Sequence, residues 1–221
     1  MADQTLSDVH LEGIRVRGTI LGANTRENST TAILERLTIN KFYTTGDIKF
    51  NSNTSSVIIN QCVVSGNITG RADITASNML VMNSNIGTVA TFNKASDVQI
   101  NHCIVRNSSY YTDTNSAFIW TNDIMTFVTD RYARNTGQNS VMRNCLYVGN
   151  NMGDNSVVEN CTQVALADIF SDAANAYYSA DRTYELKQPE TWTGTDNTQV
   201  GIHGGSGFSK IPATPVVKDL S

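Results

Sequence analysis

The segments VIINQCVV (57–64) and VQINHCIV (98–105) decide the fold, because each places a polar pair inside a run of apolar, largely β-branched residues. The pattern recurs along most of the chain. In order, its copies are VHLEGIRV (9–16), AILERLTI (32–39), VIINQCVV (57–64), LVMNSNIG (80–87), VQINHCIV (98–105), IWTNDIMT (119–126), SVMRNCLY (140–147) and SVVENCTQ (156–163). A polar pair at this place is typical of a strand that turns a corner, so the pair is interpreted as a bend.

One residue per segment serves to align the copies. The aligned column is Ile14, Leu37, Cys62, Asn85, Cys103, Ile124, Cys145 and Cys161. Its members are 23, 25, 23, 18, 21, 21 and 16 residues apart, a mean of 147/7 = 21. Repeats of this length with variable spacing are typical of a solenoid, whose loops lengthen without disturbing the stacked strands. The alignment also predicts that Asn60, Asn83, Asn101 and Asn122 lie one above another and share amide hydrogen bonds.

We therefore predict an all-β fold, a single-stranded right-handed parallel β-helix (solenoid) of about eight coils. Residues 1–183 would form the β-helix, and residues 184–221 an irregular C-terminal closing segment packed on the last coils. An antiparallel β-sandwich is the main alternative, but hairpin signals such as Asn-Gly are nearly absent from the chain.

Composition narrows the range of partners. The chain has 221 residues, 16 Lys and Arg against 20 Asp and Glu, and a net charge of −4 without a basic run, so nucleic acid is not an expected partner. No stretch approaches the roughly 20 apolar residues that span a bilayer. Residues 1–13 are polar, so no export signal is expected in this chain.

The four cysteines, Cys62, Cys103, Cys145 and Cys161, fall on one column that faces the interior. Cys62 and Cys103 are two coils apart, about 9.6 Å, which is too far for a disulfide. Cys145 and Cys161 lie on adjacent coils, and the sequence leaves their redox state open. Buried free thiols are the favoured interpretation, and no histidine is placed to complete a zinc site.

The stacked Asn-x-Cys and Asn-Cys bends resemble the pectate-lyase-like right-handed β-helix superfamily. The tail TYELKQPETWTGTDNTQVGIHGGSGFSKIPATP (183–215) resembles the closing segment of uncharacterised β-helix proteins exported by gut Bacteroidetes. The resemblance implies an extracellular or cell-surface location. Such proteins usually begin with a capping helix, whereas a coil begins here at Val9. Either residues 1–8 form a minimal cap, another domain or subunit covers that end, or the chain is a fragment of a longer protein.

The best candidate site lies on two long connections, 106–116 (RNSSYYTDTNS) and 129–139 (TDRYARNTGQN). They leave successive coils at equivalent places and are expected side by side. The ligand-binding candidates are Tyr110, Tyr111 and Tyr132, and the catalytic candidates are Asp113, Asp130, Arg131 and Arg134. Aromatic rings beside carboxylates and guanidinium groups are a common way to hold sugar rings and uronates. Tyrosines that only pack over the coil are the competing interpretation.

Other polar residues give weaker signals. His102 and Asp123 are placed on the same bend column, one coil apart, where solvated side chains are favoured over an acid–base pair. His10 has no evident partner, and His203 belongs to a glycine-rich turn. The acidic residues Asp3, Asp8, Asp168, Asp172 and Asp181 match no known calcium loop. No cofactor is expected, with calcium as the one alternative and no metal site assigned.

The sequence favours a noncatalytic extracellular or surface β-helix module that binds glycan. Two alternatives stay open: a polysaccharide lyase or glycoside hydrolase acting on an acidic polysaccharide, and a structural or adhesin spacer. Lyases of this superfamily need clustered carboxylates and a basic residue, and hydrolases need two carboxyl groups at roughly 5 to 9 Å. The expected partner is a polysaccharide or another extracellular ligand.

Overall fold

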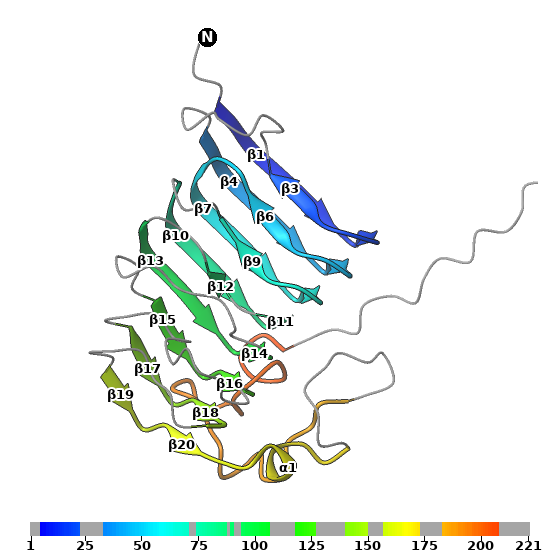
Figure 1. Ribbon diagram of the computed structural model, residues 1–221. Coiled ribbons are helices and arrows are strands. Elements are labelled where there is room, and N and C mark those ends of the chain that lie inside the picture. The colour runs from blue at the N-terminus through cyan, green and yellow to red at the C-terminus, as the bar shows by residue number, and fades with distance from the viewer. Residues whose placement is uncertain are drawn as a thin grey trace, which may run out of the picture.

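The computed structural model shows parallel strands stacked as a solenoid (Figure 1). The structure describes residues 5–22, 33–70, 74–87, 89–90, 94–106, 118–126, 140–149, 157–172 and 183–207. Within these residues the chain forms twenty strands and one short helix, α1 (Leu166–Ile169). No helix in this part of the chain is long and apolar enough to cross a membrane.

The strands form three sheets, which we name A, B and C. Sheet A contains β1 (Thr5–Glu12), β4 (Ile33–Asn40), β7 (Asn53–Asn60), β10 (Thr75–Met82), β13 (Lys94–Asn101), β15 (Phe118–Thr121), β17 (Val141–Arg143) and β19 (Val157–Glu159). Sheet B contains β2 (Arg15–Val16), β5 (Tyr43–Thr44), β8 (Val63–Val64), β11 (Asn85–Ile86), β14 (Ile104–Val105), β16 (Ile124–Met125), β18 (Leu146–Tyr147) and β20 (Thr162–Gln163). Sheet C contains β3 (Ile20–Gly22), β6 (Ile48–Phe50), β9 (Ile68–Thr69) and β12 (Val89–Ala90).

Every strand pair in the three sheets is parallel, as the sequence predicts for a β-helix. The coil count needs a correction. Sheets A and B each have eight strands, in agreement with the predicted eight copies, but sheet C has four, so within the described residues four turns carry a strand on all three sides. We number the coils 1 to 8 by the order of the strands in sheet A.

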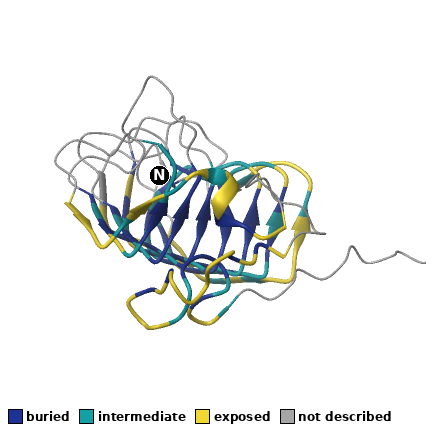
Figure 2. Ribbon diagram, turned by 90° about the horizontal axis from the view of Figure 1, so that it is seen from below, coloured by how far each residue is buried: buried dark blue, intermediate teal, exposed yellow. Residues whose placement is uncertain are grey.

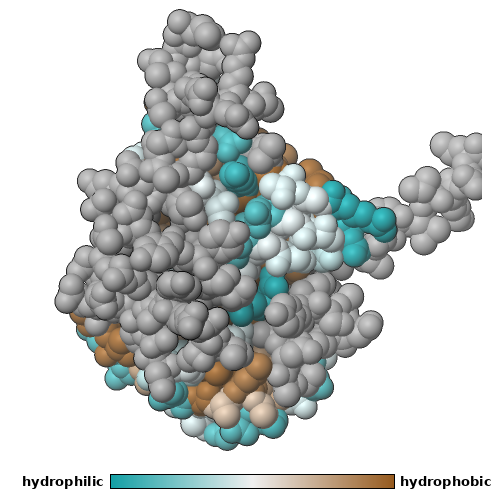
Figure 3. Space-filling view, viewed as in Figure 1, coloured by the Kyte–Doolittle hydropathy of each residue, from teal (hydrophilic) through white to brown (hydrophobic). Residues whose placement is uncertain are grey.

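Side chains that point inward form the core along the axis of the solenoid. Val57, Ile59, Val81, Val98 and Ile100 are each 0% exposed and belong to one continuous cluster of apolar residues. Figure 2 shows the buried residues along the middle of the stack, with intermediate and exposed residues around them. Where described residues are visible in Figure 3, hydrophobic patches are interrupted by hydrophilic ones.

A bend with a left-handed backbone joins sheet A to sheet B in all eight coils. The residues at this bend have φ between 45° and 67°, and they are Gly13, Lys41, Gln61, Asn83, His102, Asn122, Asn144 and Asn160. This conformation costs most L-residues roughly 1–2 kcal/mol and is easiest for Gly and Asn. The predicted polar bend is therefore confirmed in seven coils, whereas in coil 2 the predicted pair Glu35-Arg36 lies within β4 and the bend is at Lys41. The left-handed backbone explains why asparagine recurs there.

The register corrects three members of the predicted column. The residue after the bend is Phe42 in coil 2, Ser84 in coil 4 and Asp123 in coil 6, in place of the predicted Leu37, Asn85 and Ile124. The corrected spacings are 28, 20, 22, 19, 20, 22 and 16, with the same mean of 21. Apolar residues recur at such short intervals that a shifted frame also matches the pattern.

The predicted asparagine column is also wrong, because its members belong to two neighbouring columns. Asn60 and Asn101 end strands of sheet A, whereas Asn83 and Asn122 occupy the left-handed bend. Amide hydrogen bonds do run along the stack: Asn60 Nδ2 donates to Asn40 Oδ1 at 3.2 Å.

All four cysteines are free thiols on the column that follows the bend. Cys62, Cys103 and Cys145 are at most 1% exposed, as expected for small buried hydrophobic side chains. Cys161, in coil 8, is partly exposed.

The first coil differs from the sequence expectation. Residues 5–8 belong to β1, which pairs with β4, so they do not form a cap. Leu6 and Ile14 of this coil are 47% and 39% exposed, and Val157 and Val158 of coil 8 are 48% and 42% exposed. Within the described residues, apolar side chains thus remain exposed at both ends of the stack.

Candidate functional site

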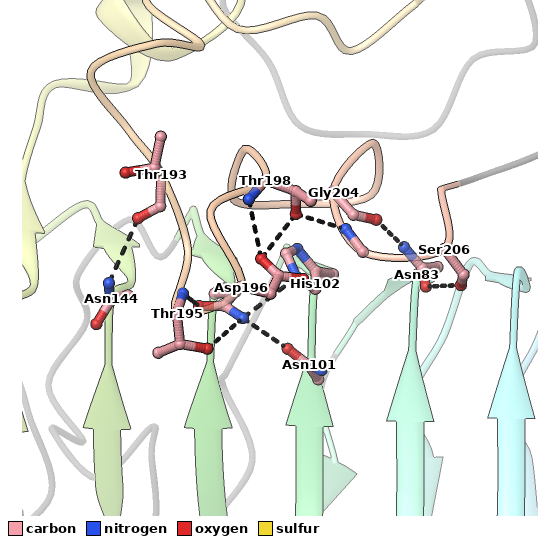
Figure 4. Close-up of polar contacts among 12 residues, drawn as sticks. Asn83, Asn101, His102, Asn144, Thr193, Thr195, Asp196, Thr198, Gly204 and Ser206 are labelled. Atoms are coloured by element: carbon pink, nitrogen blue, oxygen red, sulfur yellow. Dashed lines mark hydrogen bonds and ion pairs between the residues drawn. The ribbon is translucent and has the colours of Figure 1, made fainter.

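The most extensive polar cluster in the described structure lies where the closing segment crosses the left-handed bends (Figure 4). Bend side chains from coils 3 to 7 contact this segment in reverse order along the chain. Asn144 Nδ2 donates to Thr193 O at 3.4 Å, and Gln61 Nε2 donates to Gly207 O at 2.8 Å. The closing segment therefore runs back along the solenoid from coil 7 to coil 3.

Apolar side chains of sheet B pack against the same segment. Ile104, Ile124 and Leu146, on the outer face of sheet B, pack with residues of α1 and the closing segment. The partners in this second cluster are Ile169, Phe170, Tyr184, Leu186, Trp192, Val200 and Ile202, all at most 8% exposed. At about 25 cal/mol for each Å² of buried apolar area, such a cluster contributes several kcal/mol.

His102 lies at the centre of the polar cluster and is only 1% exposed. Its Nε2 is 3.0 Å from Asp196 Oδ2. Both predictions made for this histidine are wrong: it is not solvated, and it does not share a column with Asp123, because His102 aligns with Asn122 in the next coil. The contact joins residues 94 positions apart, which no repeat pattern indicates.

Asn122 links His102 to the closing segment. Its Nδ2 lies 3.1 Å from Asn101 Oδ1, 3.2 Å from Thr195 Oγ1 and 3.2 Å from His102 Nε2. An amide nitrogen has two hydrogens, so it donates to Asn101 and Thr195, while His102 Nε2–H donates to Asp196. The Asn122 Oδ1 atom accepts from Thr195 N at 2.8 Å. All of the hydrogen-bonding groups of this amide are therefore satisfied inside the protein.

Asn83 binds the next part of the closing segment. Its Nδ2 donates to Gly204 O at 2.7 Å and to Ile202 O at 3.2 Å, and its Oδ1 accepts from Ser206 Oγ at 2.7 Å. Asn83 is 0% exposed. Three hydrogen bonds to the protein thus replace the hydrogen bonds that the Asn83 side chain would make to water, and they offset the free-energy cost of its desolvation.

The glycines of the closing segment allow it to lie directly on the His102 ring. A Cβ atom on Gly204 would lie 2.3 Å from His102 Nδ1, and one on Gly205, where φ is +56°, would lie 2.9 Å from His102 Cδ2. A Cβ on Gly194 would lie 2.7 Å from Asn122 Cγ. The Gly-Ile-His-Gly-Gly motif, predicted from the sequence as a glycine-rich turn, therefore also forms a packing surface for His102.

Asp196 is held in its charged form. Partial burial raises the pKa of this carboxyl group, but hydrogen bonds from Thr198 Oγ1 and N–H, together with His102, outweigh it and leave the pKa below its usual value. The carboxylate thus accepts from two groups of its own turn and from the buried imidazole. A histidine beside an aspartate can act as an acid–base pair, but here the contact between His102 and Asp196 joins the bend of coil 5 to the closing segment.

Asp123 occupies a different environment inside the solenoid. It is 0% exposed, and its Oδ1 accepts from Cys103 N at 2.7 Å. Burial raises the pKa of this carboxyl group well above its ordinary value. Ser84 has the same role two coils earlier, where its Oγ accepts from Cys62 N at 3.0 Å. An acceptor on this column therefore satisfies the N–H of the coil before it.

The predicted ligand-binding and catalytic residues lie outside the described residues: Tyr110, Tyr111, Asp113, Asp130, Arg131, Tyr132 and Arg134. The structure does describe the residues that flank their connections. Thr126 N donates to Val105 O at 2.9 Å, and Phe118 N donates to Ser140 Oγ at 3.0 Å. The two connections thus begin on neighbouring strands and end on neighbouring strands.

Two of the acidic residues considered for calcium have protein partners in the described structure. Asp8 forms an ion pair with Arg36, whose Nε lies 2.7 Å from Asp8 Oδ1. Asp172 Oδ2 accepts from Thr183 N at 2.8 Å. Among the described residues no three His, Cys, Asp or Glu side chains gather in a group able to hold a metal ion. Asp3 and Asp181 lie outside these residues.

Comparisons with protein-family models, with curated proteins and with solved structures found no match to this chain. The resemblance of segment 183–215 to exported pectate-lyase-like β-helix proteins stays a prediction from the sequence.

Proposed function

We propose that this chain is a noncatalytic β-helix module, exported or displayed at a cell surface, that binds glycan through the connections 106–116 and 129–139. The proposal is supported by the pairing of the strands that precede and follow these connections. Strands β14 and β16 pair in register, as do β15 and β17, so both connections leave and rejoin the solenoid one coil apart. Two chemically similar loops that start and end on neighbouring strands would be able to contribute to one binding site.

The residue types on these loops suit a sugar ligand. Tyrosine rings supply flat apolar faces for pyranose rings, and arginine forms paired hydrogen bonds with uronate carboxylates. We propose the noncatalytic form because the His–Asp contact of the described structure has a structural role. It joins His102 of the bend to Asp196 of the closing segment, and Asp196 also accepts a hydrogen bond from Thr198 Oγ1.

The test is affinity electrophoresis in gels that contain acidic or neutral polysaccharides, with a variant in which Tyr110, Tyr111 and Tyr132 are replaced by alanine. We expect retardation by at least one polysaccharide and a dissociation constant at least about tenfold higher in the triple variant, a loss of roughly 1.4 kcal/mol. Tyr43→Ala is the matched control, since Tyr43 lies on β5, away from both connections.

The same samples, with and without calcium, are followed for absorbance at 235 nm and for reducing ends. Product that disappears in Arg131→Ala would replace the proposal with the lyase or hydrolase alternative. No retardation by any polysaccharide would reject glycan binding.

A further inference from the structure

Cys145 and Cys161 are neighbours on adjacent coils. The flanking residues pair in register, Arg143 with Glu159 and Leu146 with Thr162, and Cys145 N donates to Cys161 Sγ at 3.4 Å. Each thiol also lies 3.3 Å from a carbonyl oxygen of its own coil, Cys145 Sγ from Arg143 O and Cys161 Sγ from Glu159 O. Neighbouring strands of a sheet lie about 4.8 Å apart, within the range of roughly 4.4–6.8 Å between the Cα atoms of a disulfide.

The other cysteines on this column are separated by different residues. Ser84 lies between Cys62 and Cys103, and Asp123 lies between Cys103 and Cys145. Cys145 and Cys161 are therefore the one pair of cysteines on adjacent coils, since the chain has four in all.

Access and acidity distinguish the two thiols. Cys145 is 1% exposed, and burial raises its pKa. Cys161 is partly exposed, and hydrogen bonds from the Cys145 thiol and N–H lower its pKa to about 7. A thiol with a pKa near the ambient pH combines a large thiolate fraction with good nucleophilicity. Cys161 is thus the attacking thiol and Cys145 its resolving neighbour.

We propose that Cys145 and Cys161 form a redox-active dithiol that exchanges with low-molecular-weight disulfides at the last coil. The Cys161 thiolate attacks the small disulfide, forms a mixed disulfide and expels one small thiolate. Cys145 then loses its proton and attacks Cys161 Sγ, which forms the intramolecular bond and expels the second thiolate. Two protein thiols are oxidised and one small disulfide is reduced to two thiols.

The intramolecular bond would tie β17 and β18 to β19 and β20. These last strands carry Val157 and Val158, which are among the most exposed apolar residues described. Oxidation would therefore hold the last coil against the stack, and reduction would leave it held by its backbone hydrogen bonds and side-chain packing.

The test uses the whole native protein in buffers of oxidised and reduced glutathione, followed by alkylation and peptide mass spectrometry. We expect a Cys145–Cys161 crosslink, with Cys62 and Cys103 alkylated only after denaturation. In reduced protein we expect iodoacetamide to modify Cys161 at least about tenfold faster than the buried cysteines.

Two variants separate the steps. In Cys145→Ser, glutathione is expected to remain on Cys161 as a stable mixed disulfide; in Cys161→Ser, neither adduct nor crosslink is expected in the native state. A wild-type protein that stops at the Cys161 adduct would refute the resolving step. Reaction of Cys161 no faster than Cys62 would refute the proposal as a whole, and this measurement needs no variant.

Discussion

His102 lies between the bends of the solenoid and the closing segment. We predict that His102→Ala lowers the free energy of unfolding by about 2–4 kcal/mol, because it leaves a cavity beneath Gly204 and Gly205 and removes a partner of Asp196. Urea denaturation measures the change. The control is His10→Ala: the His10 side chain is 57% exposed, so a change below about 0.5 kcal/mol is expected. Equal effects of the two variants would contradict the role given to His102.

The raised pKa of Asp123 predicts that the free energy of unfolding decreases as the pH rises. Since its pKa is raised in the folded protein, the folded state binds a proton that the unfolded state has released above about pH 4. Its contribution to stability is therefore complete below pH 4 and declines as pH rises, by at most about 1.4 kcal/mol per pH unit, up to the folded pKa.

Asp123→Ser should remove this decline and stabilise the protein at pH 7 by about 1–3 kcal/mol, because serine fills the equivalent position in coil 4. Urea denaturation from pH 4 to 8 checks both effects. Asp168→Ser, at an exposed position in α1, is the control. A wild-type stability that is flat between pH 4 and 7 would disprove the buried, protonated state.

Single residues also mark the limit of sequence reasoning. Ser84 and Asp123 face the interior although both are polar, because each accepts a hydrogen bond from the N–H of the preceding coil. A rule that places apolar residues inside puts Ile124 on this column in place of Asp123, one position too far along the chain. The contact between His102 and Asp196 has no periodic signal, so it could not be predicted.

At the scale of elements, a column of glycines joins sheet B to sheet C in coils 1 to 4. Its members are Gly18, Gly46, Gly66 and Gly87. A Cβ on Gly66 would lie 2.9 Å from the Gly46 carbonyl carbon and 2.1 Å from Asp47 Oδ1. The absence of a side chain therefore lets successive coils approach each other at this corner.

We predict that Gly66→Ala destabilises the fold by about 2–4 kcal/mol, since backbone atoms of coil 2 would have to move. Gly13→Asn is the matched control: nothing lies within 4 Å of a Cβ there, and asparagine occupies the same left-handed bend in four other coils. Its expected effect is below about 1 kcal/mol in the same urea titration. A Gly66→Ala protein as stable as the wild type would show that the coils are not in close contact at this corner.

The glycine column was available in the sequence as RGT (17–19), TGD (45–47), SGN (65–67) and IGT (86–88), and the 28 residues between Gly18 and Gly46 give the register of coil 2 that the cysteine column missed. The misplacement of Leu37 arose because coil 2 begins 28 residues after coil 1, beyond the spacing expected from the other copies. Strand existence was thus predictable from the apolar pattern, whereas register required a second repeated motif.

The whole molecule is a stack in which each coil contacts its neighbours, so its stability is expected to vary along the axis. We predict that amide hydrogen exchange is slowest in β7, β10 and β13 and fastest in β1 and β19, which pair on one side only in the described structure. Exchange followed by mass spectrometry checks this. Uniform protection from coil 1 to coil 8 would indicate that both ends are covered.

The closing segment also sets an order of events during synthesis. Translation proceeds from the amino end, so coils 5 to 7 can stack before residues 192–202 have been synthesised. Until then the outer face of sheet B presents Ile104, Ile124 and Leu146 to its surroundings. A chain truncated within that interval would contain the stacked coils but would keep these apolar side chains exposed. The last codons therefore determine whether the product is protected from aggregation.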